Sequence, residues 1–503
     1  MSSPRPSAVV VLAAGGGTRM RSALPKVLHP LAGRTLLGHA LAAARGADPQ
    51  RLVVVVRHER DRVAAAAREA DADVLVADQD DVPGTGRAVA CGLDALAADG
   101  GAPAGTVVVT YGDVPLLEPG TLVDLVAQHE QRGSAVTVLT AEPQDPAGLG
   151  RVLRGPDGGV ERIVEHKDAT EAERAVREVN TGIYAFDAAV LADALGRVGR
   201  DNAQGEVYLT DVLAVARGDG LAVAALPVAD AAEVDGVNDR VQLARAGAEL
   251  NRRLLERWMR AGVTVVDPAT TWVDVDVELA PDVRLEPGVQ LLAGTRVEGG
   301  AVVGPDTTLS GCTVGVGASV VRTHGSGAEV GEGASVGPFS FLRPGTRLGA
   351  GGRIGAYVET KNAVIGTGSK VPHLSYVGDA EIGEHSNIGA ATVFVNYDGV
   401  HKHRSRVGDH VRIGSDTMLV APVEVGDGAY TAAGSVIDAD VPPGAIAVAR
   451  ARQRVVEGWV ERRRAGSPSA RAAARARGRG EETTGTTGST GTTTGSTDEG
   501  DAR

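Results

Sequence analysis

The hydrophobic pattern divides the chain into stretches with different periodicities. In residues 1–240, unbroken apolar runs alternate with alanine-rich, helix-like segments. Apolar runs of this kind form strands that are buried on both faces, and helices between them favour parallel pairing. The pattern therefore predicts a mostly parallel, Rossmann-like α/β domain. Its expected strands include Val9–Leu12, Leu52–Val56, Val74–Val76, Thr106–Thr110 and Ala135–Leu139.

Residues 241–262 have a helical period instead. Leu250, Leu254, Leu255 and Trp258 recur at steps of three, four and one, and charged side chains fill the other positions. This arrangement is typical of an amphipathic helix. We expect a single linker helix between two domains.

From residue 263 to residue 464 the period changes to six, because an aliphatic side chain recurs every sixth position and is often followed by glycine. This spacing is typical of a left-handed parallel β-helix of hexapeptide repeats, in which three faces close a coil of about 18 residues. Glycine helps the backbone to turn each corner. The repeating positions are Val330, Val336, Leu342, Leu348, Ile354, Ile365, Val371, Val377, Val407, Ile413, Leu419 and Val425.

The six-residue period breaks in three places, between residues 354 and 365, 377 and 382, and 388 and 407. Breaks in a regular solenoid are where loops leave the scaffold and where function concentrates. Polar residues near these breaks are therefore candidates for a site. The tail, residues 465–503, has low complexity and lacks aromatic residues. It cannot bury a core, so we expect it to be disordered.

Composition narrows the functional classes. The 503 residues include 68 glycines and carry a net charge of −13. An acidic protein is a poor candidate for general nucleic-acid binding, although a local basic pocket can still hold anionic ligands. Two cysteines, Cys91 and Cys312, cannot build a disulfide framework, which suits a reducing cytoplasm. No signal-peptide pattern and no apolar run of membrane-spanning length occurs, so we expect a cytoplasmic protein without a membrane partner.

A glycine-rich turn follows the first predicted strand, with the sequence Ala13-Ala14-Gly15-Gly16-Gly17-Thr18-Arg19-Met20. Such a turn lets backbone N–H groups approach phosphates. Met20 breaks the dinucleotide fingerprint, and no Gly-Lys-Ser/Thr follows, so this is not a Walker A loop. Arg19 and Lys26 place two cations beside the turn, which suits a triphosphate under attack. A plain tight turn with two surface cations explains these residues equally well.

The strand predicted over Thr106–Thr110 ends in Tyr111-Gly112-Asp113. A carboxylate at the carboxyl end of a parallel strand lies where α/β sheets bind ligands. Mg²⁺ bound to a nucleotide often takes one or two carboxylates together with phosphate oxygens. Asp113 is therefore a candidate metal ligand, and a helix cap is the alternative interpretation.

In combination these segments resemble sugar-nucleotide pyrophosphorylases, on the residues Leu12-Ala13-Ala14-Gly15, Gly17-Thr18-Arg19-Met20 and Leu24-Pro25-Lys26-Val27-Leu28. With the solenoid behind them, roughly residues 7–460 closely resemble the bacterial family of bifunctional N-acetylglucosamine-1-phosphate uridyltransferases and glucosamine-1-phosphate acetyltransferases. The resemblance implies that the first domain joins N-acetylglucosamine-1-phosphate to UTP and releases pyrophosphate. The implied nucleotide and sugar-phosphate residues are Leu12, Ala13, Ala14, Gly15, Arg19, Lys26, Gln79, Gly84, Thr85, Tyr111, Gly112, Asp113, Gly150, Glu165, Asn180 and Asn238, with Mg²⁺ at Asp113 and Asn238.

The solenoid offers His373 as a candidate base, because an amine must lose a proton when it attacks a thioester and a near-neutral histidine can accept it. A lone histidine on a solenoid is more often a solvated surface residue, but cations near the breaks favour a sugar-phosphate site. The resemblance implies His373 as general base, with Glu359 assisting. The implied substrate and acetyl-CoA residues are Arg343, Lys361, Tyr376, Asn387, Ala390, Asn396, Tyr397, Ser415, Ala433 and Arg450. Four positions, Gly16, Val82, Arg87 and Ala391, depart from the usual family residues.

The resemblance also implies a homotrimer with acetyl-transfer sites shared between solenoids, and flat-sided prisms pack readily around a threefold axis. The sequence thus predicts a cytoplasmic, bifunctional enzyme of UDP-N-acetylglucosamine synthesis that uses Mg²⁺, UTP and acetyl-CoA. One alternative is a uridyltransferase whose solenoid is only an oligomerisation scaffold. A second is a non-catalytic sugar-nucleotide sensor, which the presence of Arg19, Lys26, Asp113 and Asn238 disfavours.

Overall fold

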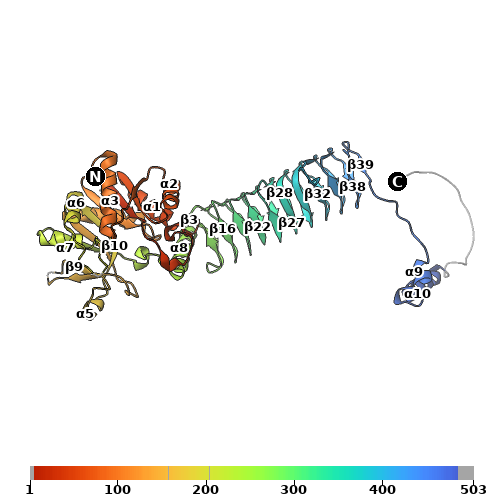
Figure 1. The fold of residues 1–503 in the computed structure, drawn as a ribbon. Helices are drawn as coiled ribbons and strands as arrows, with labels where there is room; N and C mark the ends of the chain where they lie inside the picture. Colours follow the sequence, from red (N-terminus) through yellow and green to blue (C-terminus); the bar gives the residue numbers. More distant parts are fainter. Residues whose placement is uncertain (1–4, 157, 203, 485–503) are drawn as a thin grey trace, which may run out of the picture. The chain divides into compact units, whose positions relative to one another are not determined.

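The structure is a computed structural model that describes residues 5–156, 158–202 and 204–484. One compact unit ends at Val448, and a second begins at Ala449. Within the first unit, an α/β domain precedes a long stack of short strands (Figure 1).

The sheet of the α/β domain contains nine strands over the described residues. Its main path runs in the order β11-β7-β10-β6-β1-β4-β5, and β8 and β9 branch from β10. β10 pairs antiparallel with β6 and β7, whereas the other neighbours on this path are parallel. The prediction of a mostly parallel sheet is confirmed. The bounds are β1 (Ala8–Leu12), β4 (Arg51–Val56), β5 (Leu75–Asp78), β6 (Thr106–Tyr111), β7 (Val136–Ala141), β8 (Arg151–Arg154), β9 (Val160–Val164), β10 (Val179–Asp187) and β11 (Val223–Pro227).

Helices cover both faces of this sheet, which explains why its central strands are apolar without interruption. Val9 and Val11 pack in one core with the first group of helices, and Val10 and Val53 pack in another core with the second group. The first group is α1 (Leu36–Gly46), α2 (Arg60–Ala70) and α4 (Pro119–Arg132). The second group is α3 (Thr85–Gly100), α6 (Ala188–Arg197) and α7 (Asp211–Gly218), and the short α5 (Glu171–Arg174) lies beside β8.

Helix α8 (Arg240–Arg260) lies where the sequence predicts a helix over residues 241–262. It begins where the Asp239 side chain accepts hydrogen bonds from the N–H groups of Val241 and Gln242. Leu254 and Leu255 are buried in the core of the strand stack. The apolar stripe of the helix therefore closes the first coil of the solenoid.

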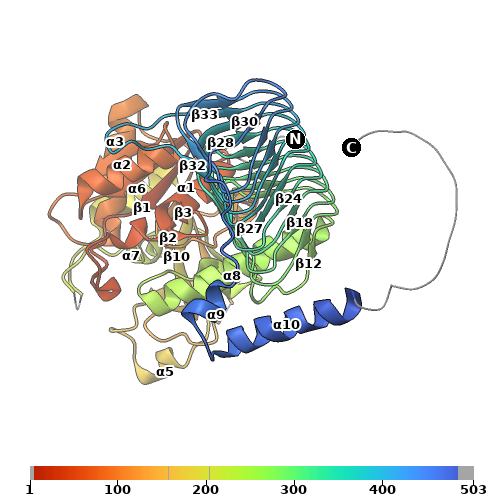
Figure 2. The same ribbon diagram turned by 90° about the vertical axis from the view of Figure 1, so that its right-hand side faces the viewer.

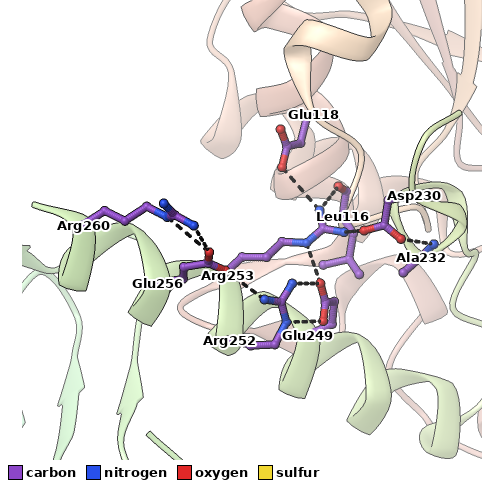
Figure 3. Close-up of polar contacts among 9 residues, drawn as sticks. All are labelled: Leu116, Glu118, Asp230, Ala232, Glu249, Arg252, Arg253, Glu256 and Arg260. Atoms are coloured by element: carbon purple, nitrogen blue, oxygen red, sulfur yellow. Dashed lines mark hydrogen bonds and ion pairs between the residues drawn. The ribbon is translucent and has the colours of Figure 1, made fainter. Parts of the chain in front are cut away.

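The polar side of α8 is fixed to the α/β domain through Arg253 (Figure 3). Its guanidinium donates to Glu249 and Asp230 at 2.8 Å each, and to the Leu116 carbonyl at 3.3 Å. Glu118 lies 3.4 Å from the same group. Hydrogen bonds to charged groups are stronger than neutral ones. Arg253 therefore holds the helix against the loops before α4 and after β11.

The chain then winds into the predicted left-handed parallel β-helix, whose coils overlie one another in Figure 2. Over the described residues, one sheet has eleven strands, from β12 (Thr264–Val265) to β39 (Ile446–Ala447), and another has seventeen, from β13 (Trp272–Val273) to β38 (Val436–Ile437). The twelve predicted inward-facing aliphatics are all buried, with no more than 3% exposure. The six-residue repeat therefore identified the core directly.

The breaks in the period have structural causes. At the first break, Thr360 takes the inward position between Ile354 and Ile365 and is fully buried. At the third break, Phe394 takes the inward position, and a loop over residues 396–404 follows. The pattern missed these positions because it counted only aliphatic side chains.

The second unit contains α9 (Trp459–Arg463) and α10 (Pro468–Thr484). The predicted disorder of residues 465–503 is therefore wrong for 468–484, because alanine and arginine, both strong helix formers, dominate this stretch. The remainder, 485–503, lies outside the described residues. The last strand of the β-helix already ends at Ala447, before the predicted domain end at residue 464. No helix in the described part of the chain is long and apolar enough to cross a membrane.

Two candidate active sites

A cavity of about 480 Å³ opens at the carboxyl ends of β1, β4, β5 and β6. Most of the predicted nucleotide residues line it, although they come from distant segments. These residues are Leu12, Ala13, Ala14, Gly15, Lys26, Gln79, Gly84, Thr85, Tyr111, Asp113 and Asn238. Gly16, Arg57 and Glu206 also line it, and no motif marks the last two.

A second cavity, of about 540 Å³, lies beside the first. Tyr111, Asp113 and Asn238 line both cavities, and Asn180 lines only the second. Two ligands bound in the two cavities would therefore meet beside Asp113 and Asn238. This is the arrangement that a transfer between two bound substrates requires.

Charged and amide groups converge at the junction. The ammonium of Lys26 contacts the Asp113 carboxylate and donates to Asn238 Oδ1 at 3.1 Å, and Arg19 donates to the same oxygen at 2.8 Å. The side chains of Lys26 and Asp113 are only 13% and 15% exposed, so Lys26 is not a surface cation. Helix α4 has Glu118 at its N-cap, so Asp113 is not a helix cap either.

The junction fits a hard divalent cation. Asp113 and Asn238 supply two oxygen donors that converge on one ammonium. No group of three or more His, Cys, Asp or Glu side chains suited to a metal occurs among the described residues. Mg²⁺ typically takes only one or two protein oxygens and completes its shell with water and substrate phosphates. The two donors therefore suffice for a metal that arrives with a nucleotide.

Tyr111 forms a wall between the two cavities. Burial, followed by the charges of Asp113 and Glu165, raises the pKa of Tyr111 well above its usual value, so the phenol stays neutral. Gly182 packs directly against the ring, with a left-handed φ of +80°. A Cβ atom at Gly182 would overlap Tyr111 Cε2, so the close approach requires glycine.

The predicted sugar-phosphate residues surround the end of β10. Asn180 Oδ1 accepts hydrogen bonds from the Tyr184 hydroxyl at 2.8 Å and the Gly182 N–H at 2.9 Å. The Asn180 N–H donates to the Gly150 carbonyl at 2.9 Å.

The loops after β1 and β6 are joined by a backbone hydrogen bond. The N–H of Gly112, just after β6, donates to the carbonyl of Leu12, the last residue of β1, at 2.9 Å.

Glu165 lies beside Gly150, whose hypothetical Cβ would stand 3.5 Å from Glu165 Oε1. Burial raises the pKa of Glu165, and the negative charges of neighbouring acids add to this shift. These acids are Asp168, Asp211 and Glu206. Burial and these neighbours therefore favour the neutral form of Glu165 more than that of an exposed glutamate.

At the other end of the first cavity, Gln79 uses its amide nitrogen to donate to the carbonyls of Val82 at 3.1 Å and Gly84 at 3.3 Å. Its Oε1 accepts no hydrogen bond within the described residues and remains available as an acceptor.

Arg87, one of the departures from the family pattern, pairs with Asp80 at 2.6 Å and does not line the cavity.

The predicted acetyltransferase residues stack on successive coils at one corner of the β-helix. At each step, a corner residue donates its backbone N–H to the carbonyl of a predicted residue one coil earlier. The donors and acceptors are Ala391 to His373 at 3.2 Å, Asp416 to Ala390 at 2.7 Å, and Gly434 to Ser415 at 2.9 Å. Ala433 precedes Gly434 and continues the column. His373 ends β29 (Lys370–His373), with an exposed side chain.

Asn387 begins β31 (Asn387–Ile388), which pairs with β29. Its side chain is half-buried. Ala391 departs from the usual glycine and has a left-handed φ of +59°, which glycine adopts more readily.

The predicted cations lie on the adjoining sheet, just past this corner. The strands involved are β25 (Ser340–Leu342), β28 (Glu359–Ile365) and β30 (Tyr376–Ile382). Arg343 pairs with Glu359 at 3.0 Å, and Lys361 lies 3.5 Å from Asp379. Glu359 and Tyr376 are register partners on neighbouring coils. The structure thus gathers both cations and Tyr376 beside the column of His373.

Asp379 organises this cluster, and sequence reasoning missed it. Its Oδ2 accepts from Asn396 Nδ2 at 2.6 Å and its Oδ1 from Asn362 at 2.9 Å. Burial raises the pKa of Asp379, but the hydrogen bonds from Asn362 and Asn396, with the charge of Lys361, outweigh this and hold it below its usual value. Asn396 also donates to the Tyr376 hydroxyl at 3.4 Å.

The loop over residues 396–404 carries Tyr397, which is exposed and donates to the Gly399 carbonyl at 2.6 Å. Lys402 pairs with Tyr397 across this loop and was also missed. A hydrogen bond with Lys361, followed by repulsion from its charge, lowers the pKa of Lys402. Its position inside the third break of the period was the one available signal. Arg450 lies in the second unit, so it is not placed beside the other residues.

Comparisons with known proteins agree with this division. Residues 9–180 match the MobA-like NTP transferase domain, and residues 404–439 match the bacterial transferase hexapeptide (six repeats). The bifunctional protein GlmU of Kineococcus radiotolerans is 67% identical over 482 residues, which cover 96% of both chains. The bifunctional GlmU proteins of Pseudarthrobacter chlorophenolicus and Mycolicibacterium vanbaalenii are 60% and 59% identical, over 93% of this chain and 95% of theirs. This chain belongs to the GlmU family.

Membership of the GlmU family confirms the family prediction made from the loop and solenoid motifs. It makes the chain a bifunctional transferase that joins a nucleotidyltransferase domain to a hexapeptide acyltransferase domain. The non-catalytic sensor is thereby excluded.

Proposed function

We propose that residues 1–240 transfer the uridylyl group of UTP to N-acetylglucosamine-1-phosphate and that residues 263–464 acetylate glucosamine-1-phosphate with acetyl-CoA. The observation that supports the first activity best is the junction of the two cavities at Lys26, Asp113 and Asn238. The column of His373 beside Arg343 and Lys361 supports the second activity.

In the uridyl-transfer reaction, a phosphate oxygen of the sugar phosphate attacks the α-phosphorus of UTP. A new P–O bond forms as the bond to the pyrophosphate oxygen breaks, so the charge passes to pyrophosphate. Lys26 and Arg19 neutralise the polyphosphate, and the loop at Ala14 and Gly15 approaches it with backbone N–H groups. Asn180 and Glu165 orient the sugar. Catalysis here consists mainly of positioning and charge neutralisation.

Asp113 and Asn238 would hold Mg²⁺, which would neutralise phosphate charge at the junction of the two cavities. The Lys26 ammonium contacts the oxygens of both residues. Lys26 is long and flexible, so it can turn toward the phosphates when the substrate enters. Lys26 thus lies within reach both of the residues that would hold the metal and of the phosphates of the substrate.

In the acetyl-transfer reaction, the amine of glucosamine-1-phosphate attacks the thioester carbon. The C–N bond forms, the C–S bond breaks, His373 accepts the proton from nitrogen, and CoA leaves as its thiol. Arg343, Lys361, Tyr376 and Asn387 hold the sugar phosphate. Acetyl-CoA lies along the corner column and its neighbours, which are Ala390, Asn396, Tyr397, Ser415 and Ala433.

The assembly is a homotrimer that works in the cytoplasm, where UTP and acetyl-CoA are supplied. Exposed large apolar side chains on the β-helix support self-association, among them Phe339, Tyr357 and Leu374 at 49%, 60% and 60% exposure. Light scattering should give three times the chain mass of 51.3 kDa. A monomeric mass would contradict this assembly.

Two variants test the assignment of the two reactions. His373→Ala should lose acetyl transfer and retain uridyl transfer, whereas Asp113→Ala should do the reverse. His385→Ala and Asp124→Ala are matched controls, because both side chains are exposed and neither lies in the two sites. An unchanged acetyl-transfer rate in His373→Ala would refute the base assignment. Absence of CoA release in the wild type would instead favour the scaffold alternative.

A further inference from the structure

Arg57 has no role in the activity derived above, yet it lines the nucleotide cavity. It follows the last residue of β4, and Gln79 follows the last residue of β5. The pairing of Val56 with Asp78 places Arg57 and Gln79 side by side at the sheet edge, and the Gln79 N–H donates to the Val56 carbonyl at 2.9 Å. The two side chains therefore belong to the same end of the cavity.

That end is where the base of a nucleotide would lie. The phosphate-binding elements, Gly15 and Lys26, follow β1, and Asp113 follows β6 on the far side of β1. The sheet order β6-β1-β4-β5 puts Arg57 and Gln79 on the opposite side of the glycine-rich loop from Asp113. A nucleotide with its phosphates at Asp113 thus directs its base toward Arg57.

The neighbouring arginines are committed to carboxylates outside the cavity. Arg60 makes two hydrogen bonds to Asp78, at 2.8 and 3.1 Å. Arg87 makes two to Asp80, at 2.9 and 2.6 Å. Neither arginine lines the cavity.

Arg57 differs from both of them. Within the described residues Arg57 pairs with Asp81, at 3.5 Å, and the Asp81 side chain is fully exposed. An ion pair this long and this exposed is weak. Since a guanidinium carries five N–H donors in a planar fork, Arg57 retains donors for a ligand.

We propose that Arg57 determines base specificity by donating to the C4 carbonyl oxygen of uracil. The proposal rests on the uridyl-transfer function above. Gln79 spends its amide hydrogens on two backbone carbonyls, so its Oε1 accepts the N3–H of uracil. Arg57 and Gln79 thus present one donor and one acceptor, and uracil presents the complement. Cytosine presents an amino group to Arg57 and a lone pair to Gln79, and both pairs repel.

The test compares UTP with CTP as the nucleotide donor to N-acetylglucosamine-1-phosphate. Arg57→Ala should lower kcat/KM for UTP about 10- to 100-fold, as expected for loss of a charged donor to a base edge. The value for CTP should not fall, because the variant removes a donor that repels the cytosine amino group, so discrimination falls by at least the same factor. Arg57→Lys should restore part of it, because lysine keeps the charge without the fork. Arg60→Ala, the matched control, should leave the UTP/CTP ratio unchanged.

Calorimetric binding of UMP and CMP gives a readout that does not depend on turnover. Arg57→Ala should weaken UMP binding about 10-fold or more and should not weaken CMP binding. Equal weakening of both nucleotides would mean that Arg57 binds phosphate or ribose and would overturn the proposal, as would no change in either. If the wild type releases no pyrophosphate from UTP but prefers UMP through Arg57, the function fails and the base assignment stands.

Discussion

Gly182 gives a direct test of how Tyr111 holds the two cavities of the α/β domain apart. Its φ is +80°, and a Cβ at this position would overlap Tyr111 Cε2. A left-handed φ costs an alanine roughly 1 kcal/mol relative to glycine. Overpacking against a buried ring adds about 1–3 kcal/mol. We therefore expect Gly182→Ala to destabilise the domain by about 2–4 kcal/mol.

Gly220 separates the two contributions. It has a similar φ of +76°, but no atom lies within 4 Å of the place where its Cβ would stand. Gly220→Ala should therefore cost only about 1 kcal/mol, or roughly 2–4 °C in melting temperature for a domain of this size. Gly182→Ala should lower it by on the order of 10 °C.

Activity supplies the second readout. Displacement of Tyr111 changes the wall of both cavities, so Gly182→Ala should reduce uridyl transfer at least tenfold. The proposed acetyl-transfer site lies on the β-helix, which has a hydrophobic core of its own, so acetyl transfer should stay at the wild-type rate. The reasoning would be refuted if Gly182→Ala had the same melting temperature as Gly220→Ala and kept full uridyl transfer.

Three further predictions concern charge and metal. Arg253→Met should lower the free energy of unfolding in urea by about 2 kcal/mol, because it removes charge-assisted hydrogen bonds to Glu249 and Asp230. Arg260→Met, at an exposed ion pair, should change this free energy by no more than about 0.5 kcal/mol. Equal effects of the two substitutions would contradict the anchoring role of Arg253. Hydrogen bonds from backbone N–H groups and from His403 lower the pKa of Asp398 to about 2. The stabilisation of the loop by these hydrogen bonds is therefore present above about pH 4 and is lost as the pH falls toward 2. The protection of amides in this loop, taken relative to the intrinsic exchange rate at each pH, should fall over that interval. Asp398→Ala should abolish the step, and a step that persists would refute it. Removal of Mg²⁺ with EDTA should abolish uridyl transfer and spare acetyl transfer, and loss of both would refute separate metal dependence.

The sequence predicted the solenoid and the strands well, because both depend on local repetition. Val371 and Val377 are buried for the same reason that they recur, since each must fill the narrow interior of a coil. The pattern passed over Phe394 and Thr360, because an aromatic ring and a threonine can fill the same place without matching an aliphatic period.

The site was predictable only as far as local motifs extend. Lys26 and Asp113 were found from their own neighbourhoods, but the hydrogen bond from Lys26 to Asn238 joins segments 212 residues apart. Arg57 and Asp379 carried no motif, because their roles come from register between strands and coils. The prediction that the tail is disordered failed over α10 for a different reason, because the helix propensity of its residues outweighed their low complexity.

The most direct test of bifunctionality follows a labelled acetyl group through both sites. The wild-type protein is incubated with glucosamine-1-phosphate, acetyl-CoA carrying a heavy-isotope acetyl group, UTP and Mg²⁺, and the products are identified by mass. We predict UDP-N-acetylglucosamine that carries the heavy acetyl group, together with CoA and pyrophosphate. A nucleotide sugar without the label, or labelled N-acetylglucosamine-1-phosphate that never reaches UDP, would contradict a chain that performs both reactions.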